Sequence, residues 1–121
     1  MSQRVVAVIG ASSDPSKYGH KAVRAYLRQG WRVYPVTPKP DPIHGLAPVA
    51  SISAIPEHVH RATIYLPPEL GLRVLPEIAA KRVDEFFVNP GAESDELLEA
   101  ARALGLEPIV ACSIVDIGER P

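Results

Sequence analysis

The sequence predicts an α/β fold in which a Rossmann-like, doubly wound and mostly parallel sheet of five strands carries helices on both faces. Three observations support this prediction. Short β-branched apolar runs recur along the chain, amphipathic segments with helical spacing lie between them, and the connections are short. The 121 residues, 46% hydrophobic and 22% charged, suit one domain with its own core, so we expect residues 1–121 to form a single domain.

The first two predicted strands flank the first predicted helix. Residues 4–9 form a continuous apolar run followed by glycine, which is typical of a strand buried on both faces. Apolar side chains at helical spacing, Leu27 among them, predict a helix over residues 18–29 that ends at Gly30. Residues 31–37 predict the second strand, although Pro35 cannot donate to a ladder and argues against pairing on both sides.

The rest of the chain alternates between strands and helices. The proline-rich residues 38–42 form a stiff loop, and residues 46–55 hold at most a short edge strand and one helical turn. The helix that follows the third strand is expected to bury Leu70 and Val74 in its apolar stripe. The remaining elements are a strand (62–66), a helix (69–81), a strand (86–88), a helix (94–104) and a strand (108–112). Right-handed crossovers make such a sheet parallel, and ligands bind outside the carboxyl ends of its strands, next to the first strand.

Composition excludes several classes of protein. A net charge of -1, from 13 basic and 14 acidic residues, gives no field that would gather nucleic acid or an anionic membrane surface. No apolar run approaches the roughly 20 residues of a membrane span. Cys112 is the only cysteine, so we expect no internal disulfide and a cytoplasmic location. Thirteen prolines and a single asparagine suggest heat adaptation.

The turn after the first strand has the composition of a phosphate cradle. Residues 10–19 supply small residues, hydroxyl groups and Lys17 beside the start of a helix, where unpaired N–H groups favour an anion. Residues 93–96, at the start of the last long helix, are instead rich in acids that would repel a phosphate. The turn matches neither the P-loop nor the G-x-G-x-x-G fingerprint. An ordinary strand-to-helix loop stays open as an alternative.

Lys39 bears on which cofactor such a site would take. A NAD site of the usual kind has an acid after the second strand, whereas this sequence has Thr37, Pro38 and Lys39 there. A lysine favours an additional phosphate on the adenosine ribose, which coenzyme A carries on its 3′ oxygen and NADP on its 2′ oxygen. A solvated loop lysine is the alternative reading.

The chain resembles, over nearly its whole length, the small single-domain CoA-binding proteins related to the CoA-binding domain of succinyl-CoA synthetase and of ADP-forming acyl-CoA synthetases. Several motifs in order carry the resemblance: V-A-V-I-G-A-S (6–12), K-Y-G (17–19), V-Y-P-V-T-P-K (33–39), N-P-G-A-E-S (89–94) and A-C-S-I-V (111–115).

The resemblance implies a coenzyme A site at the carboxyl ends of the strands. It places one group of residues around the diphosphate: Gly10, Ala11, Ser12, Ser13, Lys17, Tyr18 and Gly19. A second group lies around the adenosine and its 3′-phosphate: Val36, Thr37, Pro38 and Lys39. A third group walls the adenine or pantetheine path and the direction of the thiol: Leu66, Pro67, Pro68, Pro90, Gly91, Ala92 and Cys112. Because no synthetase domain follows in the sequence, the resemblance implies binding of CoA or acyl-CoA without the ligase reaction.

Two classes of function stay open. The first is a CoA or acyl-CoA binding protein that is not catalytic by itself, acting as a homodimer or with a separately encoded partner enzyme. The second is a small NADP-dependent oxidoreductase. The same fold and Lys39 favour it, but the sequence lacks a Tyr-x-x-x-Lys pair. An interaction protein without a ligand is a third possibility. We expect no catalytic residue, and whether the chain is an enzyme stays open.

Two further features of the sequence have a chemical and a structural interpretation. His58 and His60 share one face of an extended segment, but two histidines without a clustered cysteine or acid are a poor ligand set, so we expect no metal. Cys112 either forms a mixed disulfide with the thiol of CoA or belongs to the core.

Overall fold

A computed structural model of the chain describes residues 3–121. It contains one five-stranded, all-parallel sheet in the order β2-β1-β3-β4-β5, which confirms the predicted fold class. The elements in chain order are β1 (Val5–Ile9), α1 (Tyr18–Arg28), β2 (Arg32–Val36), the 3-10 turn η1 (Ile52–Ala54), β3 (Arg61–Ile64), α2 (Pro68–Lys81), β4 (Glu85–Val88), α3 (Asp95–Ala103), β5 (Pro108–Val110) and α4 (Ser113–Asp116). Within these residues, no helix is both long and apolar enough to cross a membrane.

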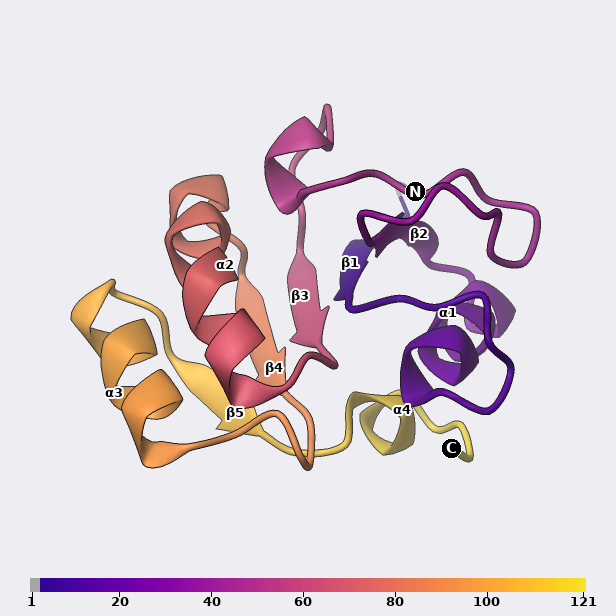
Figure 1. Cartoon of the computed structure of the whole chain (residues 1–121). Helices are drawn as coiled ribbons and strands as arrows, with labels where there is room; N and C mark the ends of the chain where they lie inside the picture. The colour runs from indigo at the N-terminus through magenta and orange to yellow at the C-terminus, as the bar shows by residue number, and fades with distance from the viewer. Residues whose placement is uncertain (1–2) are drawn as a thin grey trace.

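The helices lie in two layers, one on each face of the sheet. Figure 1 shows α2 and α3 together on one face and α1 and α4 on the other. All five residues of β1 are buried, because alternate side chains of this strand pack into the two opposite cores. The strand order reverses between β1 and β3, so the loops that leave β1 and β3 diverge there and open a crevice.

The edge strand β2 accommodates Pro35 without losing a ladder bond. The carbonyl of Pro35 accepts a hydrogen bond from the Val49 N–H at 2.9 Å, so the backbone of Pro35 faces away from β1. The missing N–H therefore faces the outer edge of the sheet. The expected edge strand in residues 46–55 is a single bridge between Val36 and Val49, and the expected helical turn is η1.

The predictions for the buried face of α1 and for the end of the last strand were wrong. Leu27 is 37% exposed, because α1 turns Ala22, Val23, Ala25 and Tyr26 toward the core instead. The last strand ends at Val110 rather than at residue 112, and a short helix that the sequence analysis did not predict, α4, follows it. A four-residue helix is too short to show helical periodicity in a sequence.

The helix α2 also differs from its prediction. Leu70 is 41% exposed, and Val74 is half-buried although it packs against the core, while Gly71, Leu75 and Ile78 form the buried face. The apolar stripe of α2 therefore extends past the core onto a free surface beside the carboxyl ends of the strands.

Candidate functional site

A cleft of about 870 Å³ lies at the carboxyl ends of the strands, where the strand order reverses. The loops that leave all five strands contribute to its lining. The lining residues are Ile9, Gly10, Ala11, Ser12, Lys17, Tyr18, Gly19, Val36, Thr37, Pro38, Lys39, Ala50, Tyr65, Leu66, Pro67, Leu70, Val74, Asn89, Pro90, Gly91, Ala92, Cys112 and Pro121.

Most of the residues predicted to bind a cofactor line this one cleft. Ser13 and Pro68 do not: Ser13 is exposed on the turn, and Pro68 is the first residue of α2, one position beyond the lining residue Pro67. The structure thus brings together segments that the sequence analysis assigned to one site, and their contact with a ligand stays a prediction.

The turn between β1 and α1 approaches the helix so closely that glycine is required at two positions. Gly10 has a φ of +89°, and its N–H donates to the Val36 carbonyl at 3.0 Å. A Cβ on Gly19 would lie 2.2 Å from the Gly10 carbonyl oxygen, a distance that real Cβ atoms do not show. The first turn of α1 therefore rests directly on the end of β1, beside the cleft.

The first turn of α1 is open to an anion, as the sequence predicted. The N-cap residue Lys17 makes no side-chain cap hydrogen bond, and no acidic residue lies in the first turn. In α3 the hydroxyl of Ser94 accepts from the Leu97 N–H at 3.0 Å, and acids occupy the first turn. The partial positive charge at the start of α1 is therefore free to attract a negatively charged group, and that of α3 is already satisfied.

One acid, Asp14, does lie in the loop before α1, but its carboxylate is already engaged. Its Oδ1 accepts from the N–H of Ser16 at 2.9 Å and from the hydroxyl of Ser16 at 2.8 Å. These hydrogen bonds lower the pKa of Asp14, and Lys17 and His20 add to the effect. The carboxylate therefore holds the loop in a tight turn.

The loop that follows β2 forms the second wall of the cleft. The Thr37 N–H donates to the Val49 carbonyl at 2.9 Å, which fixes the start of the loop. The Lys39 N–H lies 3.3 Å from the hydroxyl oxygen of Thr37, and Lys39 is exposed at the rim of the cleft. The lysine therefore offers a positive charge beside the cleft with its ammonium group accessible.

A pair of histidines joins the start of α1 to the same loop. Nε2 of His20 lies 3.0 Å from Nε2 of His44, and His44 adopts a φ of 49° to reach it. Burial lowers the pKa of His20, and His44 and Arg24 lower it further. The contact links the two segments that carry the predicted diphosphate and adenosine residues.

The apolar wall of the cleft was partly missed by the sequence analysis. Leu70 and Val74, one helical turn apart on α2, line the cleft together with Leu66, and Ala50 lines it from the segment between β2 and η1. Their apolar character made them indistinguishable from core residues in the sequence. Ile9, Tyr65, Asn89 and Pro121 also line the cleft and were not predicted.

The end of the cleft formed by the loops after β4 and β5 contains buried polar groups. Cys112 is half-buried and lines the cleft, so it is not a fully enclosed core residue. Burial raises the pKa of Tyr65, and its hydroxyl has no hydrogen-bond partner among the described residues. Asn89 is only 3% exposed and bonds to three different groups of the surrounding chain.

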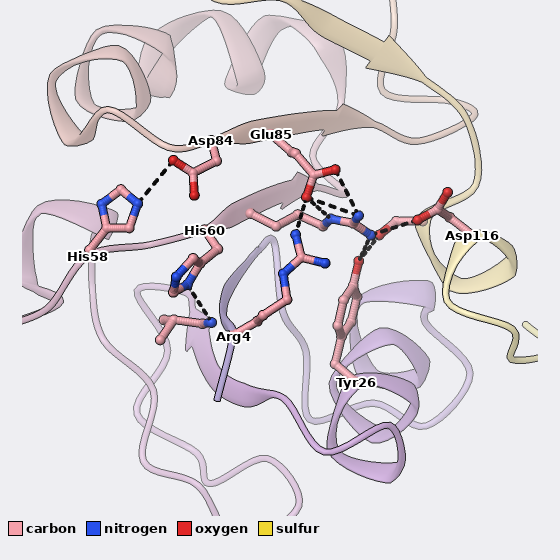
Figure 2. Close-up of polar contacts among 10 residues, drawn as sticks. Arg4, Tyr26, His58, His60, Asp84, Glu85 and Asp116 are labelled. Carbon is pink, nitrogen blue, oxygen red and sulfur yellow. Dashed lines mark hydrogen bonds and ion pairs between the residues drawn. The ribbon is translucent and has the colours of Figure 1, made fainter. Parts of the chain in front are cut away.

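The opposite end of the sheet carries a different polar cluster (Figure 2). Arg61, 4% exposed, donates to both carboxylate oxygens of Glu85 at 3.1 Å, to Asp116 at 2.9 Å and to the Tyr26 hydroxyl at 3.3 Å. Arg4 donates to the same Glu85. This network saturates the buried guanidinium, so its role is structural.

His58 and His60 lie near that end with a third residue that the sequence did not reveal. Asp84 brings a carboxylate to within 3.1 Å of His58 Nε2, and the three ligand atoms lie within 4.8 Å of one another (Figure 2). However, Nδ1 of His60 accepts a hydrogen bond from the Val5 N–H at 2.9 Å. The ring proton of His60 is therefore on Nε2, and this nitrogen is no metal ligand while that hydrogen bond is kept.

Comparison with known proteins gives a consistent picture. The family model described as CoA binding domain matches residues 4–117. The alpha subunit of the ADP-forming acetate–CoA ligase II of Pyrococcus furiosus is 32% identical over 117 residues, which cover 88% of this chain and 26% of the relative. The ADP-forming acetate–CoA ligase I of Archaeoglobus fulgidus is 32% identical over 82% of this chain and 14% of the relative. The chain thus spans about a quarter or less of the length of these relatives.

Solved structures show the same similarity. A conserved hypothetical protein of Pyrococcus furiosus has a TM-score of 0.83 at 31% identity, covering 95% of this chain and 99% of that one. The dinucleotide forming acetyl-coenzyme A synthetase 1 of Ca. Korarchaeum cryptofilum has a TM-score of 0.72 at 31% identity, covering 87% of this chain and 25% of that one.

Proposed function

The chain belongs to the CoA-binding domain family, and from this premise we propose that it binds coenzyme A or an acyl-CoA in the cleft at the carboxyl ends of the strands. The observation that carries the proposal is the continuity of this cleft. It joins an acid-free helix start to an accessible lysine on one side and to the apolar wall and Cys112 on the other.

The three parts of the cleft suit the three parts of coenzyme A. The start of α1 with Lys17 suits the diphosphate, since unpaired amides and the helix dipole attract an anion. Lys39 suits the 3′-phosphate of the adenosine, and Leu70 and Val74 offer an apolar surface for the adenine. The loops with Pro90, Gly91, Ala92 and Cys112 then flank the pantetheine arm.

A thermal-unfolding experiment tests the proposal and separates it from the NADP-dependent oxidoreductase. The ligands are CoA, 3′-dephospho-CoA, acetyl-CoA, NADP and NAD. A ligand present at about 100 times its Kd stabilises the folded protein by about 2.7 kcal/mol, which raises Tm by several degrees. We expect the largest shift with CoA or acetyl-CoA and a smaller one with 3′-dephospho-CoA. A shift with NADP alone would favour the oxidoreductase, and no shift with any ligand would refute the proposal.

The relatives also motivate a proposal about partners. One of them is named as an alpha subunit, and both curated relatives extend far beyond the matched region. We propose that this chain presents its ligand to a separately encoded partner enzyme or acts as a homodimer. The cytoplasmic location and the heat adaptation stay predictions; a Tm in the range usual for proteins of mesophiles would contradict the latter.

A further inference from the structure

Asn89 connects three separate parts of the chain beneath the thiol end of the cleft. Its Nδ2 donates to the Thr63 hydroxyl at 2.7 Å and to the Ile64 carbonyl at 2.9 Å, both on β3. Its Oδ1 accepts from the backbone N–H of Ser113 at 2.9 Å, at the start of α4. Asn89 is 3% exposed, and its side-chain amide donates both of its protons to groups of the surrounding chain.

The wall that Asn89 holds has little regular structure of its own. The strand β5 has three residues and α4 has four, so neither a long ladder nor a helical stripe fixes the loop that carries Cys112. Besides the buried side chain of Ile114, polar contacts hold α4 in place: Asn89 bonds to its first N–H, the Tyr26 hydroxyl contacts the Ser113 hydroxyl, and Arg61 pairs with Asp116. Among these contacts, the one from Asn89 is the one that lies at the cleft.

Cys112 directly precedes the N–H that Asn89 binds, and both residues line the cleft. The hydrogen bond from the Ser113 N–H to Asn89 holds the peptide unit between Cys112 and Ser113 in place, which a loop bonded only to water would not provide. The opposite wall, with the start of α1 and the loop after β2, makes no hydrogen bond to Asn89 among the described residues.

We propose that Asn89 is a positioning residue for the pantetheine arm of coenzyme A: it fixes the loop at Cys112 and Ser113 against β3 and so shapes the thiol end of the cleft. The inference rests on the proposed binding of coenzyme A. It makes a specific prediction, because the effect of Asn89 is confined to the part of the ligand that extends beyond the diphosphate.

Two ligands distinguish positioning from a general structural role. Coenzyme A and adenosine 3′-phosphate 5′-diphosphate share the adenosine, the 3′-phosphate and the diphosphate, but only the former has a pantetheine arm. Titration calorimetry gives the Kd of both for the natural protein and for Asn89→Ala. We expect the Kd of CoA to rise about tenfold, which corresponds to about 1.4 kcal/mol. We expect the Kd of the shorter ligand to change less than about twofold.

A second variant covers the case in which Asn89→Ala does not fold. Thr63→Val replaces the hydroxyl that accepts from Asn89 by a methyl group, so one buried amide proton of Asn89 loses its acceptor and the amide is held less firmly. It should raise the Kd of CoA about threefold and leave that of the shorter ligand unchanged. In both variants the Ser113 amide should exchange its hydrogen faster than in the natural protein.

Ser94→Ala is the matched control. It removes the cap of α3, which is not a lining residue of the cleft, so it destabilises the fold without removing any hydrogen bond of Asn89. It should leave both Kd values unchanged. An equal loss of affinity for the two ligands in the Asn89 and Thr63 variants, or no loss of affinity for CoA, would overturn the inference while leaving the proposed function intact. A natural protein that binds neither ligand would overturn both.

Discussion

Replacement of Gly19 by alanine gives the sharpest test of how the fold builds its anion site. The new Cβ would lie 2.2 Å from the Gly10 carbonyl oxygen and 3.1 Å from Ala11 Cα, both backbone atoms that cannot rotate away. Since real Cβ contacts stay above 3.0 Å, the start of α1 and the end of β1 must separate. Such overpacking costs about 1–3 kcal/mol, against a gain of up to about 1 kcal/mol from the better helix propensity of alanine.

We therefore expect Gly19→Ala to lower the free energy of unfolding by about 1–2 kcal/mol in urea titrations. The displaced helix start should also weaken CoA binding at least about tenfold, because hydrogen bonds to a phosphate do not survive a displacement of this size.

Gly105→Ala is the matched control for Gly19→Ala. Gly105 has a φ of +86° and no atom within 4 Å of an added Cβ, so alanine there brings backbone strain of about 1 kcal/mol without a clash. Because Gly105 lies outside the cleft, this variant should lose stability and keep its affinity for CoA. A Gly19→Ala protein with unchanged stability and unchanged Kd would refute the close-approach argument.

Three further predictions concern single side chains. In calorimetry, Lys39→Ala should raise the Kd of CoA about tenfold and that of 3′-dephospho-CoA hardly at all. Equal increases of the two Kd values would show that Lys39 does not bind the 3′-phosphate. The pKa of His20 is lowered from 6.5, so the unfolded chain takes up the proton first and the free energy of unfolding should fall as the pH drops below that value. In urea titrations at several pH values, His20→Gln should reduce this pH dependence, and an identical slope in both proteins would contradict it. Arg61→Ala should cost about 1–3 kcal/mol in the same assay, since it removes the packing and hydrogen bonds of a buried side chain while Glu85 and Asp116 keep access to water and Glu85 keeps Arg4; a loss below about 1 kcal/mol would show that water replaces the guanidinium.

The sequence predicted the strands and long helices because their patterns are local. The run in β1 is apolar at every position, and the stop at Gly10 needs only neighbouring residues to recognise. The acid-free first turn of α1 and the acidic first turn of α3 also followed from the local sequence, since both depend on which side chains lie within one helical turn. Most residues predicted for the cofactor site came from such loops, and the parallel topology alone was enough to predict that they meet at one edge of the sheet.

The tertiary structure decided the features that depend on distant partners. Leu70 and Val74 look like core residues in the sequence, and only the packing of α2 shows that they face the cleft. Asp84 joins His58 only because β3 and β4 are neighbours. In the sequence, Asn89 looks like an ordinary turn residue. The role proposed for it depends on hydrogen bonds to β3 and α4 that no local pattern encodes. Local periodicity determines which segments become strands and helices, whereas contacts between residues far apart in the chain determine what lines a site and what holds it rigid.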